Sequence, residues 1–193
     1  MALSTRFEEA LIFATRLHAR QVRKGSSVPY VSHLLIVAGM VLEQGGDEDQ
    51  TIAALLHDAV EDQGGRSTLD EIRRRFGDRV AEIVEQCSDA FTFFKPPWRK
   101  RKEAYLAHLP QASAAVRLVS AADKLHNART TLADYRSLGE ALWGRFNGGR
   151  EGTLWFYRAM VEALRAGGSS PLVEELDRVV SEIERLASAK GNA

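Results

Sequence analysis

Residues 53–62 read AALLHDAVED, four apolar residues followed by one histidine and three carboxylates within six positions. The apolar part is typical of a buried helix, so a helix that enters the core is predicted to end in polar groups. On such a helix Glu61 follows His57 by one turn. Asp62 follows Asp58 in the same way, so these side chains form two adjacent stripes on one face. Buried carboxylates need a cation or several N–H donors. A metal ion would meet this need, and a solvated helix end is the alternative.

Helical spacing of apolar residues continues outward from this stretch along almost the whole chain. Runs of alternating β-branched and aromatic residues are absent, so the sequence predicts an all-α fold. Glycines and prolines divide it into about ten helices. These are expected at residues 5–22, 32–44, 48–62, 68–76, 78–88, 98–109, 113–134, 139–146, 150–166 and 171–188.

Three helix starts carry recognisable capping signals. Thr5 with Glu8, and Thr68 with Glu71, have the spacing of a capping box. Ser170 before Pro171 predicts an N-cap followed by proline in the first helical position.

Length and composition limit the class of protein. The 193 residues with 45% hydrophobic content predict one domain over residues 1–193. Basic and acidic residues number 26 each, so no strong field toward nucleic acid or an anionic membrane is expected. Cys87 is the only cysteine, which excludes an intramolecular disulfide and fits a reducing compartment. Charged residues interrupt the N-terminal apolar stretch, so we expect a soluble, cytoplasmic protein.

Two further stretches place polar groups in apolar helices. Residues 116–127, VRLVSAADKLHN, set Asp123 and Asn127 on one face. Residues 29–37, PYVSHLLIV, put His33 at a helix start, where a lone histidine is more often structural. Combined with the first stretch, they offer imidazoles and carboxylates from three helices. Such a nitrogen and oxygen set suits Mn²⁺, Mg²⁺, Fe²⁺ or Zn²⁺.

The order H…HD…D in an all-helical chain resembles the HD phosphohydrolase superfamily. Three segments carry a closer match: RKGSSVPYVSH (23–33), ALLHDAVEDQ (54–63) and VSAADKLHNART (119–130). They resemble the hydrolase domain of the Rel/Spo alarmone enzymes and the stand-alone small alarmone hydrolases, which remove the 3′-pyrophosphate from (p)ppGpp with Mn²⁺. The resemblance covers approximately residues 5–135, and the C-terminal helices at 139–188 match only in being helical.

The resemblance implies a single HD-type helical bundle and assigns roles by position. The implied metal ligands are His33, His57, Asp58 and Asp123. The implied catalytic pair for the attacking water is Glu61 and Asp62. The implied nucleotide contacts are Arg23, Lys24 and Asn127. The chain departs from the family at Leu34, where proline is usual, and in the short loop at residues 25–28.

The sequence is also compatible with other functions. The chain could be an HD nucleotidase or dNTPase, or a non-catalytic module that senses a nucleotide. The basic run at residues 95–102 favours a solvated loop and helix start over nucleic-acid binding, and Arg101 or Lys102 could instead contact terminal phosphates. Trp155 and Tyr157 are expected in the core, and the alternative is that they line a pocket for the base. The histidines without a partner evident from spacing are taken as structural: His18, His108 and His126. The expected partner is a small nucleotide, and the sequence does not indicate an oligomeric state.

Overall fold

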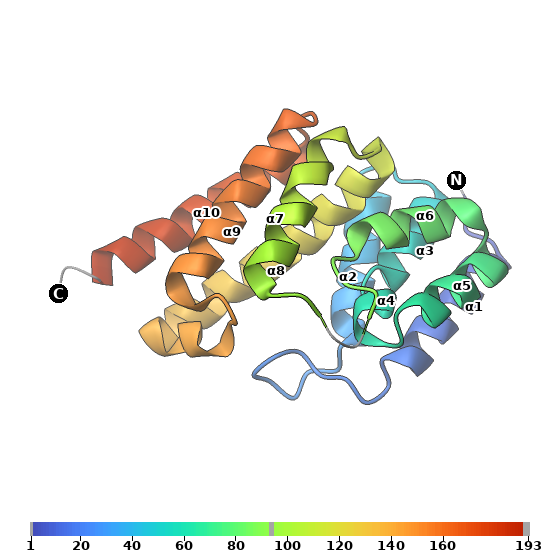
Figure 1. Cartoon of the computed structure of the whole chain (residues 1–193), viewed down its shortest axis with the longest axis horizontal. Coiled ribbons are helices and arrows are strands. Elements are labelled where there is room, and N and C mark those ends of the chain that lie inside the picture. The colour runs from blue at the N-terminus through green and yellow to red at the C-terminus, as the bar shows by residue number, and fades with distance from the viewer. Residues whose placement is uncertain (1, 93–94, 191–193) are drawn as a thin grey trace. The chain divides into compact units, whose positions relative to one another are not determined.

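The computed structural model describes residues 2–92 and 95–190, and this part of the chain is helical (Figure 1). The α-helices within it are Thr5–Leu17 (α1), Val31–Glu43 (α2), Glu48–Leu56 (α3), Ala59–Asp62 (α4), Arg66–Phe76 (α5), Asp78–Cys87 (α6), Trp98–His108 (α7), Ala114–Leu138 (α8), Gly149–Ala166 (α9) and Pro171–Lys190 (α10). Two 3₁₀ helices cover Leu109–Gln111 (η1) and Gly139–Arg145 (η2). Extended pairing in the described ranges is limited to one bridge between Val22 and Pro29. The all-α prediction is confirmed.

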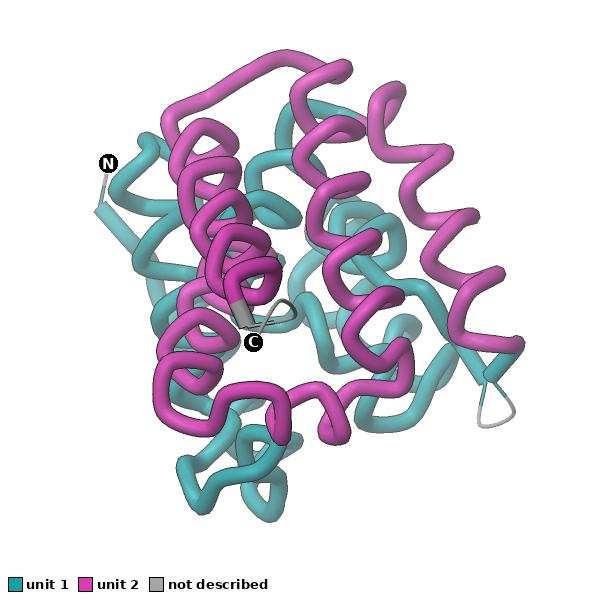
Figure 2. Tube along the Cα trace, turned by 90° about the vertical axis from the view of Figure 1, so that its left-hand side faces the viewer, with its two compact units in different colours: residues 1–96, 113–122 teal, residues 97–112, 123–193 magenta. Residues whose placement is uncertain are grey.

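The chain forms two compact units (Figure 2). Unit 1 comprises Met1–Pro96 and Ser113–Ala122, and unit 2 comprises Pro97–Ala112 and Asp123–Ala193. Helix α8 is continuous and contributes residues to both units. One domain over residues 1–193 stays a prediction.

Helix α3 is the central helix of unit 1. It packs against α1, α2 and α6. Its residues 52–56 are all apolar and buried, as expected for a helix enclosed by neighbours on every face. A capping box fixes its start: the Asp47 carboxylate accepts from the Gln50 backbone N–H at 3.0 Å, and the Gln50 side-chain oxygen accepts from the Asp47 N–H at 2.7 Å. The core thus holds the helix that leads to the HD dipeptide.

Helix α9 has the central position in unit 2. It packs against α7, α10, η1 and η2. The Trp98 indole lies on the backbone at Gly148, where an added Cβ would come within 2.7 Å of the ring. Tyr157 is buried, as expected, and its hydroxyl lies 3.0 Å from that of Thr131. Trp155 is half-buried, and the Arg99 guanidinium lies over its ring.

Four predicted helices differ from the structure by more than two residues, by a break or in helix type. The helix expected at 5–22 ends at Leu17, because the chain turns to form the Val22–Pro29 bridge. The segment 48–62 is divided at residues 57–58, where Asp58 has a ψ of −5°, about 35° from the helical value. The segment 113–134 continues to residue 138, and 139–146 is a 3₁₀ helix.

Both predicted capping boxes are wrong, whereas the third capping signal is confirmed. Ser4 caps α1 and accepts from the Arg6 N–H. Thr68 lies inside α5, which begins two residues earlier, and its hydroxyl donates to the Gln63 carbonyl. Helix α10 does begin at Pro171, and the Ser170 hydroxyl accepts from the Val173 N–H.

Gly65 makes the turn between α4 and α5. Its φ is +64°, and an added Cβ would lie 2.4 Å from the Phe91 carbonyl oxygen, so only glycine fits. This turn directs the chain away immediately after the acidic pair of α4. Within the part of the chain described, every helix is either too short or too polar to cross a membrane.

Candidate metal centre

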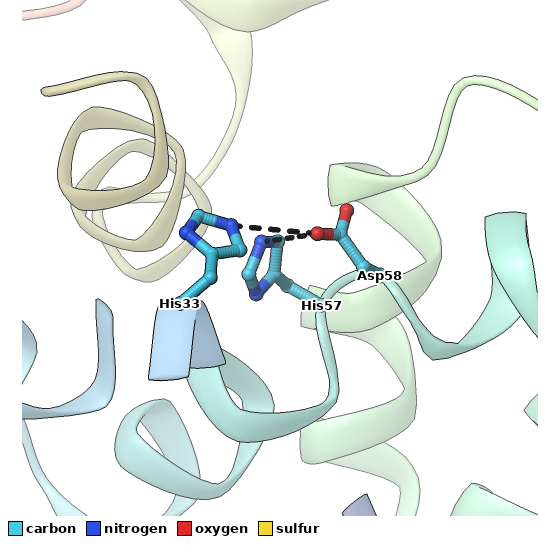
Figure 3. A group of neighbouring side chains, drawn as sticks. All are labelled: His33, His57 and Asp58. Carbon is cyan, nitrogen blue, oxygen red and sulfur yellow. Dashed lines mark ion pairs between the residues drawn. The ribbon is translucent and has the colours of Figure 1, made fainter. Parts of the chain in front are cut away.

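His33, His57 and Asp58 lie together at one end of α3 (Figure 3). The Asp58 Oδ2 atom lies 3.0 Å from His57 Nε2 and 3.5 Å from His33 Nε2. Potential ligand atoms of the three residues are all within 4.8 Å of one another. His33 is 0% exposed and His57 3% exposed, whereas the Asp58 side chain reaches solvent. Two imidazole nitrogens and one carboxylate in this space fit a single divalent cation.

The break between α3 and α4 orients the His57 ring. The ring Nδ1 lies 2.7 Å from the Ala54 carbonyl oxygen, one turn back along α3. Because a carbonyl only accepts, Nδ1 carries the hydrogen and Nε2 presents its lone pair toward Asp58. Metal-binding histidines are commonly held in this way by a second hydrogen bond.

His33 enters the cluster from the first turn of α2. Its ring centroid lies 5.1 Å from that of His57, with the planes at 70°. The ring of Tyr30 lies 5.5 Å from His33, also edge to face. Aromatic packing on two sides therefore fixes an imidazole that spacing alone would leave as a structural residue.

Tyr30 also contacts the cluster through its hydroxyl group. The hydroxyl donates to Asp58 Oδ2 at 2.5 Å, the same oxygen that faces both histidines. Tyr30 is not among the site residues predicted from the sequence. A signal was present, because Tyr30 precedes His33 by one helical turn, but the partner in α3–α4 depends on the tertiary fold.

Glu61 and Asp62 both lie on α4, the short helix that directly follows Asp58. The Lys95 ammonium group lies 3.1 Å from a Glu61 oxygen. Asp62 accepts a hydrogen bond from the Gln21 amide at 2.8 Å. Burial by surrounding groups, and then the Asp58 carboxylate, raise the pKa of Asp62, although the residue is exposed to solvent. A cation on the neighbouring ligands would act in the opposite direction.

Arg23 and Lys24 lie in the loop closed by the Val22–Pro29 bridge. Backbone bonds from the Arg23 N–H to Val28 and from the Tyr30 N–H to Gln21 hold the base of this loop. The Arg23 guanidinium lies over the Tyr30 ring, 5.6 Å from its centre, in a cation–π contact. Arg23 therefore contacts the residue that donates to Asp58. Lys24 is exposed. Their nucleotide contacts stay predictions.

Asp123 and Asn127 belong to unit 2, as part of α8. Asp123 is 4% exposed. Its Oδ1 atom accepts from the Asn127 amide at 2.6 Å, and its Oδ2 atom pairs with the Lys124 ammonium. The predicted common face is thus observed, and a buried carboxylate of this kind suits a cation. The roles of Asp123 as a fourth ligand and of Asn127 as a substrate contact stay predictions.

Known proteins resemble this chain in sequence and in structure. Residues 10–154 match the model of the HD domain family. The guanosine-3′,5′-bis(diphosphate) 3′-pyrophosphohydrolase MESH1 is 41% identical in Xenopus tropicalis and 40% identical in Homo sapiens over 124 residues. That match covers 63% of this chain and 66% of each relative, so it spans slightly less than two thirds of their length.

Solved structures extend the likeness over nearly the whole chain. A metazoan SpoT orthologue, described as hydrolysing ppGpp and playing a role in starvation responses, superposes with a TM-score of 0.80 at 26% identity. The match covers 95% of this chain and 98% of that one. The protein lmo0812 of Listeria monocytogenes gives a TM-score of 0.70 at 29% identity, over 78% and 97% of the two chains. By its matched residues, its fold and its histidine–aspartate cluster, the chain belongs to the HD domain family.

Proposed function

We propose that this chain is a metal-dependent phosphohydrolase that removes pyrophosphate from the 3′ position of guanosine-3′,5′-bis(diphosphate). The observation that carries the proposal is the cluster of His33, His57 and Asp58, followed on α4 by the acidic pair. The MESH1 relatives and the SpoT orthologue, whose names describe this activity, support the choice of substrate.

Four residues would hold the ion: His33, His57, Asp58 and Asp123. Mn²⁺ is our choice among the divalent ions that accept nitrogen and oxygen ligands, with Mg²⁺, Fe²⁺ and Zn²⁺ as alternatives. When bound, such an ion supplies Lewis acidity and makes a coordinated water more acidic. The hydrogen bond from His57 to Ala54 and that from Tyr30 to Asp58 hold two of the ligands in place beforehand.

The acidic pair would act on the water that attacks the phosphoryl group. Glu61 and Asp62 orient this water and accept its proton. The Asp62 residue is exposed to solvent, which lets water reach it. Arg23, Lys24 and Asn127 would bind the nucleotide, and cationic groups would offset charge on the departing pyrophosphate.

The partner in this proposal is a small nucleotide, acted on in the cytoplasm. Equal numbers of basic and acidic residues, 26 of each, favour a local site for an anion over a surface for nucleic acid. A single cysteine fits a reducing compartment.

A substrate panel tests the proposal. Purified protein with Mn²⁺ is incubated with ppGpp, GTP, dGTP, nucleoside monophosphates and cyclic nucleotides, and the products are separated by chromatography. The Asp58→Ala variant, prepared identically, measures the contaminating activity. We expect ppGpp to be consumed fastest, with release of pyrophosphate. Consumption of a deoxynucleotide or monophosphate while ppGpp survives would instead identify a nucleotidase, and no turnover of any compound would leave a nucleotide-sensing module.

A further inference from the structure

Four side chains of unit 1 form a hydrogen-bonded chain that ends on Asp62. The Gln21 amide nitrogen donates to Asp62 Oδ2 at 2.8 Å. On its other side, the Gln21 oxygen lies 2.7 Å from His18 Nδ1 and accepts from the Gln63 amide nitrogen at 2.6 Å. From sequence alone His18 is expected to be structural, and neither Gln21 nor Gln63 is predicted to have a role.

The chemistry of these groups fixes which end of the Gln21 amide faces Asp62. An ionised carboxylate can only accept a hydrogen bond, so the nitrogen of Gln21 must point toward it. If the amide were turned over, its oxygen would face the carboxylate, and its nitrogen would face the Gln63 donor. Both contacts would be repulsive. Because the His18 and Gln63 donors hold the Gln21 oxygen, the Gln21 nitrogen stays directed at Asp62.

His18 is held in the form that this arrangement needs. The residue is 2% exposed, and burial lowers its pKa, so the ring is neutral at physiological pH. Its Nδ1 faces the Gln21 oxygen and therefore carries the single ring hydrogen. The ring stacks on Tyr30, with centroids 5.2 Å apart and planes at 17°. Rotation of the His18 ring is thus restricted by the same tyrosine that contacts Asp58.

We infer that Gln21 is a positioning residue, which holds Asp62 Oδ2 so that Oδ1 stays directed at the attacking water, and that His18 and Gln63 fix the orientation of its amide. The inference rests on the proposed function, in which Asp62 acts on that water. A carboxylate with one oxygen anchored loses rotational freedom before the reaction, which lowers the entropic cost of reaching the productive geometry. Gln21 itself is expected to touch neither substrate nor metal.

The first test replaces Gln21 with methionine, which keeps the length of the side chain and removes both hydrogen-bonding ends. We expect kcat to fall about 10- to 100-fold, while KM and Mn²⁺ affinity measured by calorimetry change less than about threefold. Gln86→Met is the matched control, since Gln86 is exposed on α6, and it should keep wild-type rates. Normal kcat in Gln21→Met, or loss of metal, would overturn the inference.

A double-mutant cycle then tests whether Gln21 acts through Asp62. Asp62→Asn removes the carboxylate, so adding Gln21→Met to it should reduce the remaining kcat by less than about twofold. Full multiplication of the two losses would show that Gln21 acts independently, and the inference would be wrong.

A pair of His18 variants separates the hydrogen bond from ring stacking. His18→Asn places an amide donor near the position of Nδ1 without a ring, whereas His18→Phe keeps the ring and removes the donor. We expect the asparagine variant to retain more of the wild-type kcat than the phenylalanine variant, and the reverse order would contradict the proposed role of His18.

The wild-type protein distinguishes failure of this inference from failure of the proposed function. If the wild type hydrolyses no nucleotide in the panel, the proposed function fails and the inference fails with it. If the wild type is active and Gln21→Met is equally active, only the inference fails.

Discussion

Carboxylates are clustered in two regions of the molecule, at the end of α3 in unit 1 and between α9 and α10 in unit 2. The groups that contact them differ between the two regions. In unit 2, Arg158 donates to Asp177 and Glu184, and Arg165 contacts Asp177 and Glu174. Hydrogen bonds from Arg165 and from Arg158 lower the pKa of Asp177. These contacts match fixed positive charges to negative ones along a helix pair.

At the end of α3, Asp58 and Asp62 contact groups that are neutral or that titrate, whereas Glu61 pairs with Lys95. Asp58 lies against two imidazoles and the Tyr30 hydroxyl, and Asp62 accepts from the Gln21 amide. Such partners orient a carboxylate without cancelling its charge, so the negative charge can attract a cation. Carboxylates are thus paired with arginines between α9 and α10, whereas at the end of α3 we propose that Asp58 binds a metal ion and Asp62 acts on water.

Removal of a proposed ligand should have the largest effect. We expect His57→Ala and Asp123→Ala each to lose bound Mn²⁺ and to reduce turnover by about 10³-fold or more, because each deletes a donor atom to the ion. Elemental analysis and nucleotide hydrolysis measure the two effects. Asp177→Ala is the control, a carboxylate of unit 2 already paired with arginine, and it should keep its metal. Stoichiometric metal in Asp123→Ala would remove that residue from the ligand set.

Neutralising one member of the acidic pair should have an intermediate effect. Glu61→Gln is expected to keep the metal and to reduce kcat about 10²- to 10⁴-fold, since the side chain is proposed to act on water. Metal content and kcat are measured on the same preparation, with Glu184→Gln as a carboxylate control in unit 2. Loss of metal would make Glu61 a ligand, and unchanged kcat would exclude it from the reaction.

Loss of an arginine from unit 2 should affect stability alone. Arg158→Met removes hydrogen bonds to Asp177, Ser181 and Glu184 from a side chain that is 32% exposed. After allowance for solvent screening we expect a loss of about 1–2 kcal/mol, or roughly 2–8 °C in Tm, with kcat unchanged.

The same variant has a defined dependence on pH. A carboxylate whose pKa is lowered on folding contributes stability above its unfolded pKa of about 4 and loses it as pH falls further. The difference in Tm between wild type and Arg158→Met should therefore shrink below pH 4. A constant difference down to pH 2 would mean that packing of the arginine stem, and not its charge, accounts for the effect.

The fold class could be predicted because helical periodicity is a local property of the sequence. The break at residues 57–58 could not, because the apolar and acidic pattern of residues 53–62 is equally compatible with one straight helix. The end of α1 at Leu17 was missed for a related reason. The competing pairing of Val22 with Pro29 joins residues that only the folded chain brings together.

The cluster of His33, His57 and Asp58 was partly predictable, because His57 and Asp58 are adjacent in sequence and His33 follows a recognisable segment. Its supporting contacts were not. The hydrogen bond from Gln21 to Asp62 joins residues 41 positions apart, and that from Tyr30 to Asp58 spans 28. Sequence spacing therefore indicated which side chains gather at the end of α3 better than it indicated which contacts orient them.

The bond between the His57 ring and the Ala54 carbonyl has a consequence for protein engineering. A histidine–aspartate dipeptide copied onto a straight helix of another scaffold would bring the two side chains but not their orientation. A successful graft must include residues 54–58 together with the local break in the helix, since the main chain itself aims the imidazole. The smallest unit of this site that can be transferred is thus the backbone conformation of residues 54–58 together with its side chains.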